Sequence, residues 1–348
     1  MSINRSIIAA LSAALLFGAS VPFAKLLAAD IAPVLLAGLL YLGSGVGLGL
    51  IRLLRDRRLA AIRLPAAQWG WLLGTITAGG VAAPVLLMVG LRQTPAGHAA
   101  LLLNLEAVFT ALLAWLLFRE NAGRRVVLGM ALIVAGGAAL AWAPDSMAHG
   151  TLRGELAIAL ACLCWAVDNN LTRKLAAADA LFIAATKGLV AGLTNLALAW
   201  LLAATLPAPR LIAAAMAVGL LGYGLSLALF VVALRGLGSA RTAAYFSTAP
   251  FLGAAIAMLA LHEPASPALW LSAALMAAGV WLHLTEHHEH DHAHEPLRHQ
   301  HPHVHDEHHR HGHDFAWDGS EPHVHEHDHA PLVHRHPHFP DVHHRHRH

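Results

Sequence analysis

The chain has 348 residues, of which 57 % are hydrophobic and only 13 % are charged, and its formal net charge is +2 at pH 7. The charged share is about half of that in soluble globular proteins, so the composition excludes an ordinary soluble domain. The lipid bilayer is therefore the expected environment of most of the chain, and nucleic acid is not an expected partner.

Apolar stretches of about 20 residues recur along the chain, and this length crosses a hydrocarbon core of about 30 Å as a helix. Ten such stretches leave too few polar residues to form a soluble shell. The first one follows Arg5 and resembles a signal peptide, but its length and the nine stretches after it favour a retained helix. The predicted fold is an all-α integral membrane protein with ten transmembrane helices, at roughly residues 6–27, 33–51, 69–91, 96–118, 124–142, 154–175, 180–202, 210–234, 238–261 and 266–284.

Basic residues concentrate in alternate connections between these spans. Short cytoplasmic loops carry the excess of Lys and Arg, so the pattern predicts that both termini are cytoplasmic, in a bacterial plasma membrane. The residues concerned are Arg52, Arg55, Arg57, Arg58, Arg63, Arg119, Arg124, Arg125, Arg173, Lys174, Arg235 and Arg241.

The chain contains an internal repeat. A shift of 143 positions places the third to fifth spans on the eighth to tenth, and a slightly larger shift places Phe17 on Trp165 and Lys25 on Arg173. Because each half has five spans, an odd number, the halves enter the membrane from opposite sides. Inverted repeats of this kind belong to secondary transporters, whose substrate site lies near the midplane between the halves. The smaller shift matches Gly79 with Gly222, Leu91-Arg92 with Leu234-Arg235, Glu120 with Glu263, and Gly136 with Gly279.

The repeat predicts four parts of the chain: a first five-helix repeat at 1–143, a linker at 144–153, a second five-helix repeat at 154–284, and a disordered tail at 285–348.

Short motifs at corresponding places in the halves carry a resemblance to a known family. They are Phe17-Gly18 to Lys25, Trp165-Ala166-Val167-Asp168-Asn169-Asn170 to Arg173-Lys174, Glu120 followed by Gly129 and Gly136, and Glu263 followed by Gly279. Residues 5–284 resemble the EamA-type transporters of the drug/metabolite transporter superfamily. The resemblance implies a basket of helices around a central cavity and the export or uptake of small metabolites, without naming the substrate.

Ionisable groups inside spans are costly and usually face a cavity or a partner. Glu106 falls near the middle of the fourth span, and we expect it to carry a proton or cation. Asp168 and Lys187 lie at matching depths in neighbouring spans, so they form either a substrate clamp or a static ion pair between helices. Further residues that we expect at the substrate site are the polar Asn104 and Asn169 and the aromatic Trp165, Tyr223 and Tyr245.

The tail contains most of the 28 histidines of the chain, many in His-x-His patterns interspersed with Asp and Glu. Imidazole is a ligand for Zn, Ni, Cu and Co ions, so metal binding is the favoured interpretation, and a pH-responsive or merely soluble tail is the alternative. The candidate ligands are His288, His290, His292, His294, His301, His303, His305, His323, His325, His327 and His329.

Together these features predict a secondary transporter of a small organic solute with a regulatory, metal-binding tail. The alternatives are a divalent metal-ion exporter whose tail collects the ion, or a membrane metal sensor without transport. An enzyme is not expected, because the spans hold no nucleophile and base in a catalytic arrangement. No cofactor is required beyond the possible Zn, Ni or Co ions, and the protein is expected to be a monomer or homodimer.

We predict that reporter fusions at Asp145 and at the C-terminus report opposite sides of the membrane. The reason is that five spans separate the two positions. Reporter activity in cells measures this directly, and reports from the same side would contradict both the orientation and the inverted repeat.

Overall fold

A computed structural model describes residues 3–56, 66–118, 124–142, 152–172, 175, 180–285, 288–294, 297–303, 323–329 and 332–338. Contacts separate the chain into two units, Met1–Glu286 and His287–His348, which are treated separately below. Several residues named above lie outside the described residues: Arg57, Arg58, Arg63, Arg119, Glu120, Arg173, Lys174 and His305.

The first unit is built from helices, as predicted. Nine helical segments of the described residues are long and apolar enough to cross a membrane. The remaining predicted span, the sixth in chain order, is a helix of 21 residues that carries Arg153, Glu155 and Asp168. The elements are α1 (Ile3–Ala28), α2 (Pro33–Asp56), α3 (Ala66–Thr75), η1 (Ile76–Ala82), α4 (Ala83–Gln93), α5 (Ala96–Leu102), α6 (Leu105–Phe118), α7 (Arg124–Ala141), α9 (Leu152–Thr172), α10 (Ala180–Leu201), α11 (Pro209–Gly219), η3 (Leu220–Leu225), α12 (Ser226–Leu237), α13 (Ser239–Phe246), α14 (Ala249–Ala260) and α15 (Pro267–Leu284).

Within the described residues, four of the ten predicted spans are interrupted, and the interruptions lie at corresponding positions in the two halves. The π-helical segments η1 and η3 lie in the third and eighth spans, and the breaks between α5 and α6 and between α13 and α14 lie in the fourth and ninth. A shift of 143 places Asn104, in the first of these breaks, on Ser247 in the second. Pro84 and Pro250 stand at the starts of α4 and α14. Interrupted helices are typical of the substrate sites of secondary transporters.

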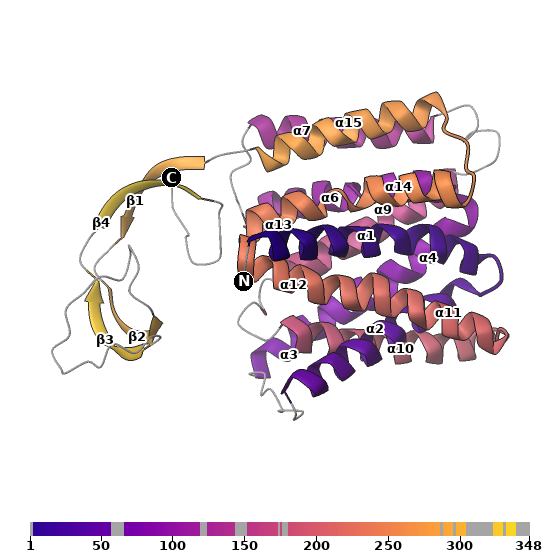
Figure 1. Ribbon diagram of the computed structural model, residues 1–348, viewed down its shortest axis with the longest axis horizontal. Helices are drawn as coiled ribbons and strands as arrows, with labels where there is room; N and C mark the ends of the chain where they lie inside the picture. Colours follow the sequence, from indigo (N-terminus) through magenta and orange to yellow (C-terminus); the bar gives the residue numbers. More distant parts are fainter. Residues whose placement is uncertain are drawn as a thin grey trace. The chain divides into compact units, whose positions relative to one another are not determined.

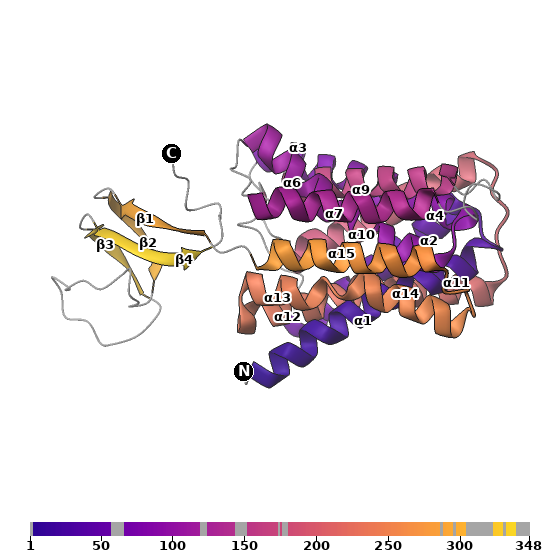
Figure 2. The same cartoon turned by 90° about the horizontal axis from the view of Figure 1, so that it is seen from above.

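Both ends of the helical unit lie at the same end of the bundle. Figures 1 and 2 show the start of α1 and the end of α15 at this end, which we call the proximal end. The opposite end, with the connections α1–α2, α4–α5, α10–α11 and α14–α15, is called the distal end. An even number of crossings requires this arrangement. That the proximal end faces the cytoplasm stays a prediction.

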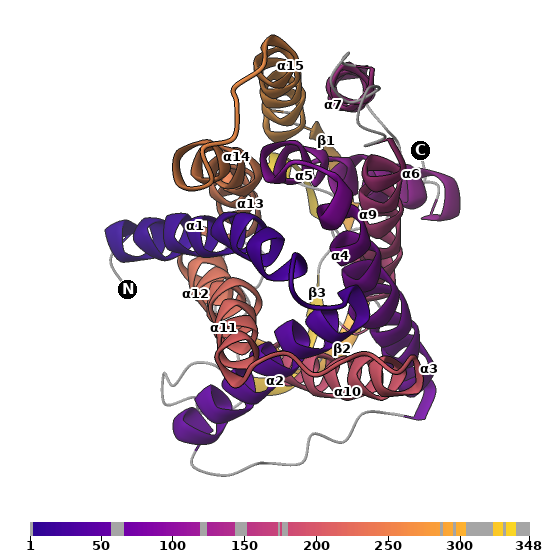
Figure 3. The same ribbon diagram turned by 90° about the vertical axis from the view of Figure 1, so that its right-hand side faces the viewer.

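The two halves interlock. Helix α2 packs on α10 and α7 packs on α15, while α1 packs on α12 and α4 on α9. Each of these pairs joins a helix of one half to a helix of the other. In Figure 3, α1 and α12, α2 and α10, and α4 and α9 lie around the middle of the bundle, whereas α7 and α15 lie outside α5 and α14. Glycines allow close approach at the crossings, as in other membrane helices: Gly45 meets Gly188 between α2 and α10, and Gly129 meets Gly279 between α7 and α15.

The His-rich unit has four described segments. They are the strands β1 (His288–His294), β2 (Leu297–His303), β3 (His323–His329) and β4 (Leu332–His338). β1 pairs antiparallel with β4, and β2 with β3. The alternating sequence has the two-residue period of a strand, and pairing satisfies the backbone hydrogen bonds. Histidine stands opposite histidine in both registers, for example His290 opposite His336 and His301 opposite His325.

Candidate functional site

The helical unit encloses a cavity of about 410 Å³ at the interface of its two halves. This lies within the range of small-molecule sites, about 300–1,000 Å³. Its walls come from α1 and α2 of the first half and from α9, α10, η3, α12 and α13 of the second. The lining combines aromatic, polar and charged residues: Phe17, Tyr41, Ser44, Asp168, Asn169, Thr172, Leu175, Ala180, Ile183, Ala184, Lys187, Gly188, Gly222, Tyr223, Ser226, Leu227, Phe230 and Phe246.

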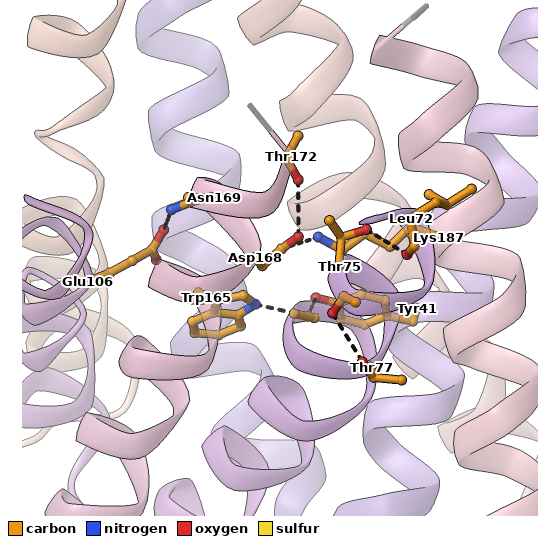
Figure 4. A network of polar contacts seen from close by, with 12 residues as sticks. Tyr41, Leu72, Thr75, Thr77, Glu106, Trp165, Asp168, Asn169, Thr172 and Lys187 are labelled. Atoms are coloured by element: carbon orange, nitrogen blue, oxygen red, sulfur yellow. Dashed lines mark hydrogen bonds and ion pairs between the residues drawn. The ribbon is translucent and has the colours of Figure 1, made fainter. Parts of the chain in front are cut away.

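The expected pair of Asp168 and Lys187 is present in the cavity wall (Figure 4). Asp168, on α9, is 3 % exposed, and its Oδ2 atom accepts a hydrogen bond from the Lys187 ammonium on α10. Its Oδ1 atom accepts a hydrogen bond of 3.2 Å from the Thr172 hydroxyl. The carboxylate therefore uses both oxygens within the protein, whereas the ammonium, which has three donors, has capacity left for a ligand in the cavity.

A proline creates the polar surroundings of this pair. Pro84 has no N–H to donate. In an α-helix the N–H of residue 84 would bond to the carbonyl of Gly80, and in a π-helix it would bond to the carbonyl of Gly79. The Gly80 carbonyl instead accepts from Asn195 Nδ2 at 3.2 Å. The polar Asn195 is thereby held, fully buried, against η1.

The Gly79 carbonyl accepts two side-chain hydrogen bonds in place of the missing backbone bond. The Tyr41 hydroxyl donates at 2.7 Å and the Trp165 indole at 3.1 Å. Gly79 itself lies against Asp168, because a Cβ atom at residue 79 would overlap the carboxylate. The interruption in the third span therefore fixes one wall of the site, as Figure 4 shows for Tyr41, Trp165 and Asp168.

Glu106 lies beside the cavity rather than in its wall. It is half-buried in the first turn of α6, directly after the break in the fourth span. Its carboxylate accepts a hydrogen bond of 2.8 Å from Asn169 Nδ2, which also lies 3.4 Å from the Thr110 hydroxyl. Asn169 lines the cavity, so a neutral amide connects the Glu106 carboxylate to the cavity.

The eight residues expected at the substrate site fall into three groups. Asp168, Asn169, Lys187 and Tyr223 line the cavity, and Trp165 and Glu106 contact groups of its wall. The remaining two lie elsewhere. The Asn104 side chain donates a hydrogen bond of 2.9 Å to the Leu101 carbonyl, next to the break between α5 and α6. Tyr245 packs with Ala9, Ala10 and Ala233.

A chain of five aromatic rings forms the rest of the cavity wall. The ring centroids of Tyr41 and Tyr223 are 5.8 Å apart, those of Tyr223 and Phe17 6.0 Å, those of Phe17 and Phe246 5.4 Å, and those of Phe246 and Phe230 5.0 Å. Of these five rings, only that of Tyr223 was predicted from the sequence to lie at the substrate site. Phenylalanine in an apolar span suits lipid and cavity alike, so no sequence signal separates the other rings from lipid-facing ones.

The lining of the cavity extends to the place where α9 ends and α10 begins, toward the proximal end. Leu175, between these two helices, and Ala180, the first residue of α10, belong to it. On the distal side, the main apolar core includes Leu36, Leu87 and Leu101, each at most 1 % exposed.

The halves keep the same backbone packing but differ in their polar groups. The shift that places Phe17 on Trp165 also places Ser20 on Asp168. Gly222, the counterpart of Gly79, packs against Ser20 just as Gly79 packs against Asp168. The charged pair is therefore carried by the second half, at a position where the first half has a serine.

Inverted halves, interrupted helices and a cavity between them are the arrangement of a membrane transporter. Residues 4–142 and 152–285 match the model of the EamA-like transporter family, and the chain belongs to this family. An uncharacterized transporter of Methanothermobacter thermautotrophicus is 29 % identical over 290 residues, which is 79 % of this chain and 84 % of that relative. A solved crystal structure, described only as that of a protein, has the same fold with a TM-score of 0.59 and 21 % identity, and the match covers 80 % of this chain and 95 % of that one.

We predict that Asp168→Asn and Lys187→Met each destabilise the protein more than the double substitution does. A single substitution leaves a largely buried charge without its partner, whereas the double one removes both charges, and the difference should reach up to about 3 kcal/mol. Thermal unfolding of the four proteins in detergent forms a double-mutant cycle. Additive effects would show that the two groups are not energetically coupled.

Proposed function

We propose that the protein is a secondary transporter that exports a small organic solute across the plasma membrane, with both termini in the cytoplasm. The observation that carries the proposal is the cavity between the halves, which holds a charged pair. A solute would enter from the proximal side and leave when the distal end opens. This is the alternating access expected of inverted repeats.

Asp168 and Lys187 are proposed to act as the substrate clamp. Opening a buried ion pair is costly unless each charge gains a new partner. A solute with a polar or charged group satisfies this condition, because it can accept from the unused donors of Lys187 while its apolar part contacts the aromatic wall. The static ion pair, the other reading of these residues, would not respond to a ligand.

Glu106 is proposed to couple transport to a proton or another cation. Its carboxylate is half-buried, and the Asn169 side chain that it holds belongs to the cavity lining. A change in the charge of Glu106 changes its hydrogen bond to Asn169 and thereby the polar surface presented to the solute. Coupling ion and solute would then act on the same side chain.

We predict that Glu106→Gln abolishes transport or removes its dependence on pH, while the protein still folds. Glutamine keeps an acceptor for Asn169 but cannot ionise. Solute flux into proteoliposomes, measured over a pH series with candidate metabolites, tests this. Asp30→Asn, at an exposed carboxylate in the α1–α2 connection, is the matched control. Unchanged flux at every pH in Glu106→Gln would leave Glu106 with a structural role alone.

A divalent metal-ion exporter is the second candidate, and the His-rich tail is the observation in its favour. Within the described part of the chain, no group of three or more His, Cys, Asp or Glu residues is placed to hold a metal ion. The helical unit therefore gives no support for a metal path. A metal sensor without transport would leave the inverted repeat and the cavity unexplained.

The tail is proposed to bind Zn, Ni or Co ions and to regulate or buffer rather than to form the path. Removing residues 286–348 is predicted to abolish the binding of several ions per chain, because the histidines leave with the tail, while organic solute flux persists. Calorimetry and flux assays measure the two effects, and a tail of equal length with asparagine in place of histidine is the control. Loss of metal efflux on truncation, with no organic solute ever moved, would instead establish the metal exporter.

A further inference from the structure

The turn between α4 and α5, at Thr94 and Pro95, is tied to the first helix by a lysine. The ammonium of Lys25, on α1, donates to the carbonyls of Leu91 and Thr94, the latter at 2.9 Å. These carbonyls lie at the C-terminal end of α4, where the last carbonyls of a helix lack partners in the helix and carry partial negative charge. A cation is therefore favourable at this place.

The same turn is tied to the second half by a carboxylate. The two oxygens of Glu263 accept from the backbone N–H groups of Ala96 and Gly97, at 2.6 and 2.8 Å. These are the first amides of α5, and hydrogen bonds to an ionised group are stronger than neutral ones. Glu263 directly follows His262, whose backbone is left-handed, with φ +53°, just after the end of α14.

Helix α9 completes the enclosure of the turn. Gly154 packs so closely on it that a Cβ atom would overlap the Thr94 hydroxyl. Glu155, 4 % exposed at its side chain, lies 3.6 Å from His98 Nδ1 on α5. Elements of both halves, α1 from the first and the α14–α15 connection and α9 from the second, therefore meet at one distal turn.

We propose that Lys25 and Glu263 are positioning residues that form a distal lock, sealing the cavity from the distal face by holding the α4–α5 turn. This inference rests on the proposed transport function, because alternating access requires the distal end to open. Opening must move the turn away from α1 or from the α14–α15 connection. Either movement breaks charge-assisted hydrogen bonds, so the lock favours the state that is open to the proximal side.

Sidedness of access to the cavity tests the lock without a substrate. Ser44, which lines the cavity, is replaced by cysteine in a Cys164→Ala background, where the remaining Cys162 is fully buried. The protein is reconstituted in proteoliposomes of known orientation and labelled from each face with a membrane-impermeant thiol reagent. Labelling of the parent protein is expected from the proximal face.

Lys25→Met and Glu263→Gln should each raise the rate of labelling from the distal face by about tenfold or more, the ratio expected for the loss of a hydrogen bond to a charged group. Lys25→Arg, which keeps the charge, should retain protection, and Asp30→Asn at the same end is the control. A merely structural role would lower the melting temperature without raising the rate of labelling from the distal face.

Unchanged distal labelling in both folded variants would overturn the lock. If either variant fails to fold, Glu263→Asp decides, because its shorter side chain weakens the contact with the amides and should raise distal labelling partly; no rise overturns the proposal. Since labelling needs no solute, a working lock in a protein that moves no solute would contradict the proposed transport function alone.

Discussion

In a bilayer every backbone donor and acceptor must find its partner within the protein, and the site depends on how this rule is met at Pro84. The proline has no N–H to donate to the carbonyls of Gly79 and Gly80, and these carbonyls accept from the side chains of Tyr41, Trp165 and Asn195. These hydrogen bonds hold η1 against α9 and α10. The interruption thus brings polar side chains and the charged pair together at the interface between the halves.

The repeat supplies the framework, and its departures from symmetry supply the chemistry. Gly79 and Gly222 pack in the same way, but one meets Asp168 and the other Ser20. The second half offers the charged pair to the cavity, and the aromatic rings come from both halves. A solute with a polar and an apolar end would find both surfaces, which is why we place binding at this interface.

The two ends of the bundle differ in what closes them. At the distal end a dense apolar core is combined with charge-assisted hydrogen bonds from Lys25 and Glu263 to the α4–α5 turn. Apolar packing alone is a weak determinant of helix association in lipid, because the lipid is equally apolar. Directional bonds to a turn can be broken and reformed as a unit, which suits an end that must open in each transport cycle.

Hydropathy and periodicity determined the ten spans, the inverted repeat, and the matching depths of Asp168 and Lys187, since these follow from local composition and from a rise of about 1.5 Å per residue. Sequence reasoning also singled out Glu106 and Asn169, but not the hydrogen bond between them. The aromatic wall around Phe17, the π-helical segments and the distal contacts of Lys25 were decided by tertiary structure alone. In a membrane helix the lipid-facing and protein-facing sides are both apolar, so only the packing of all helices decides which side chains meet.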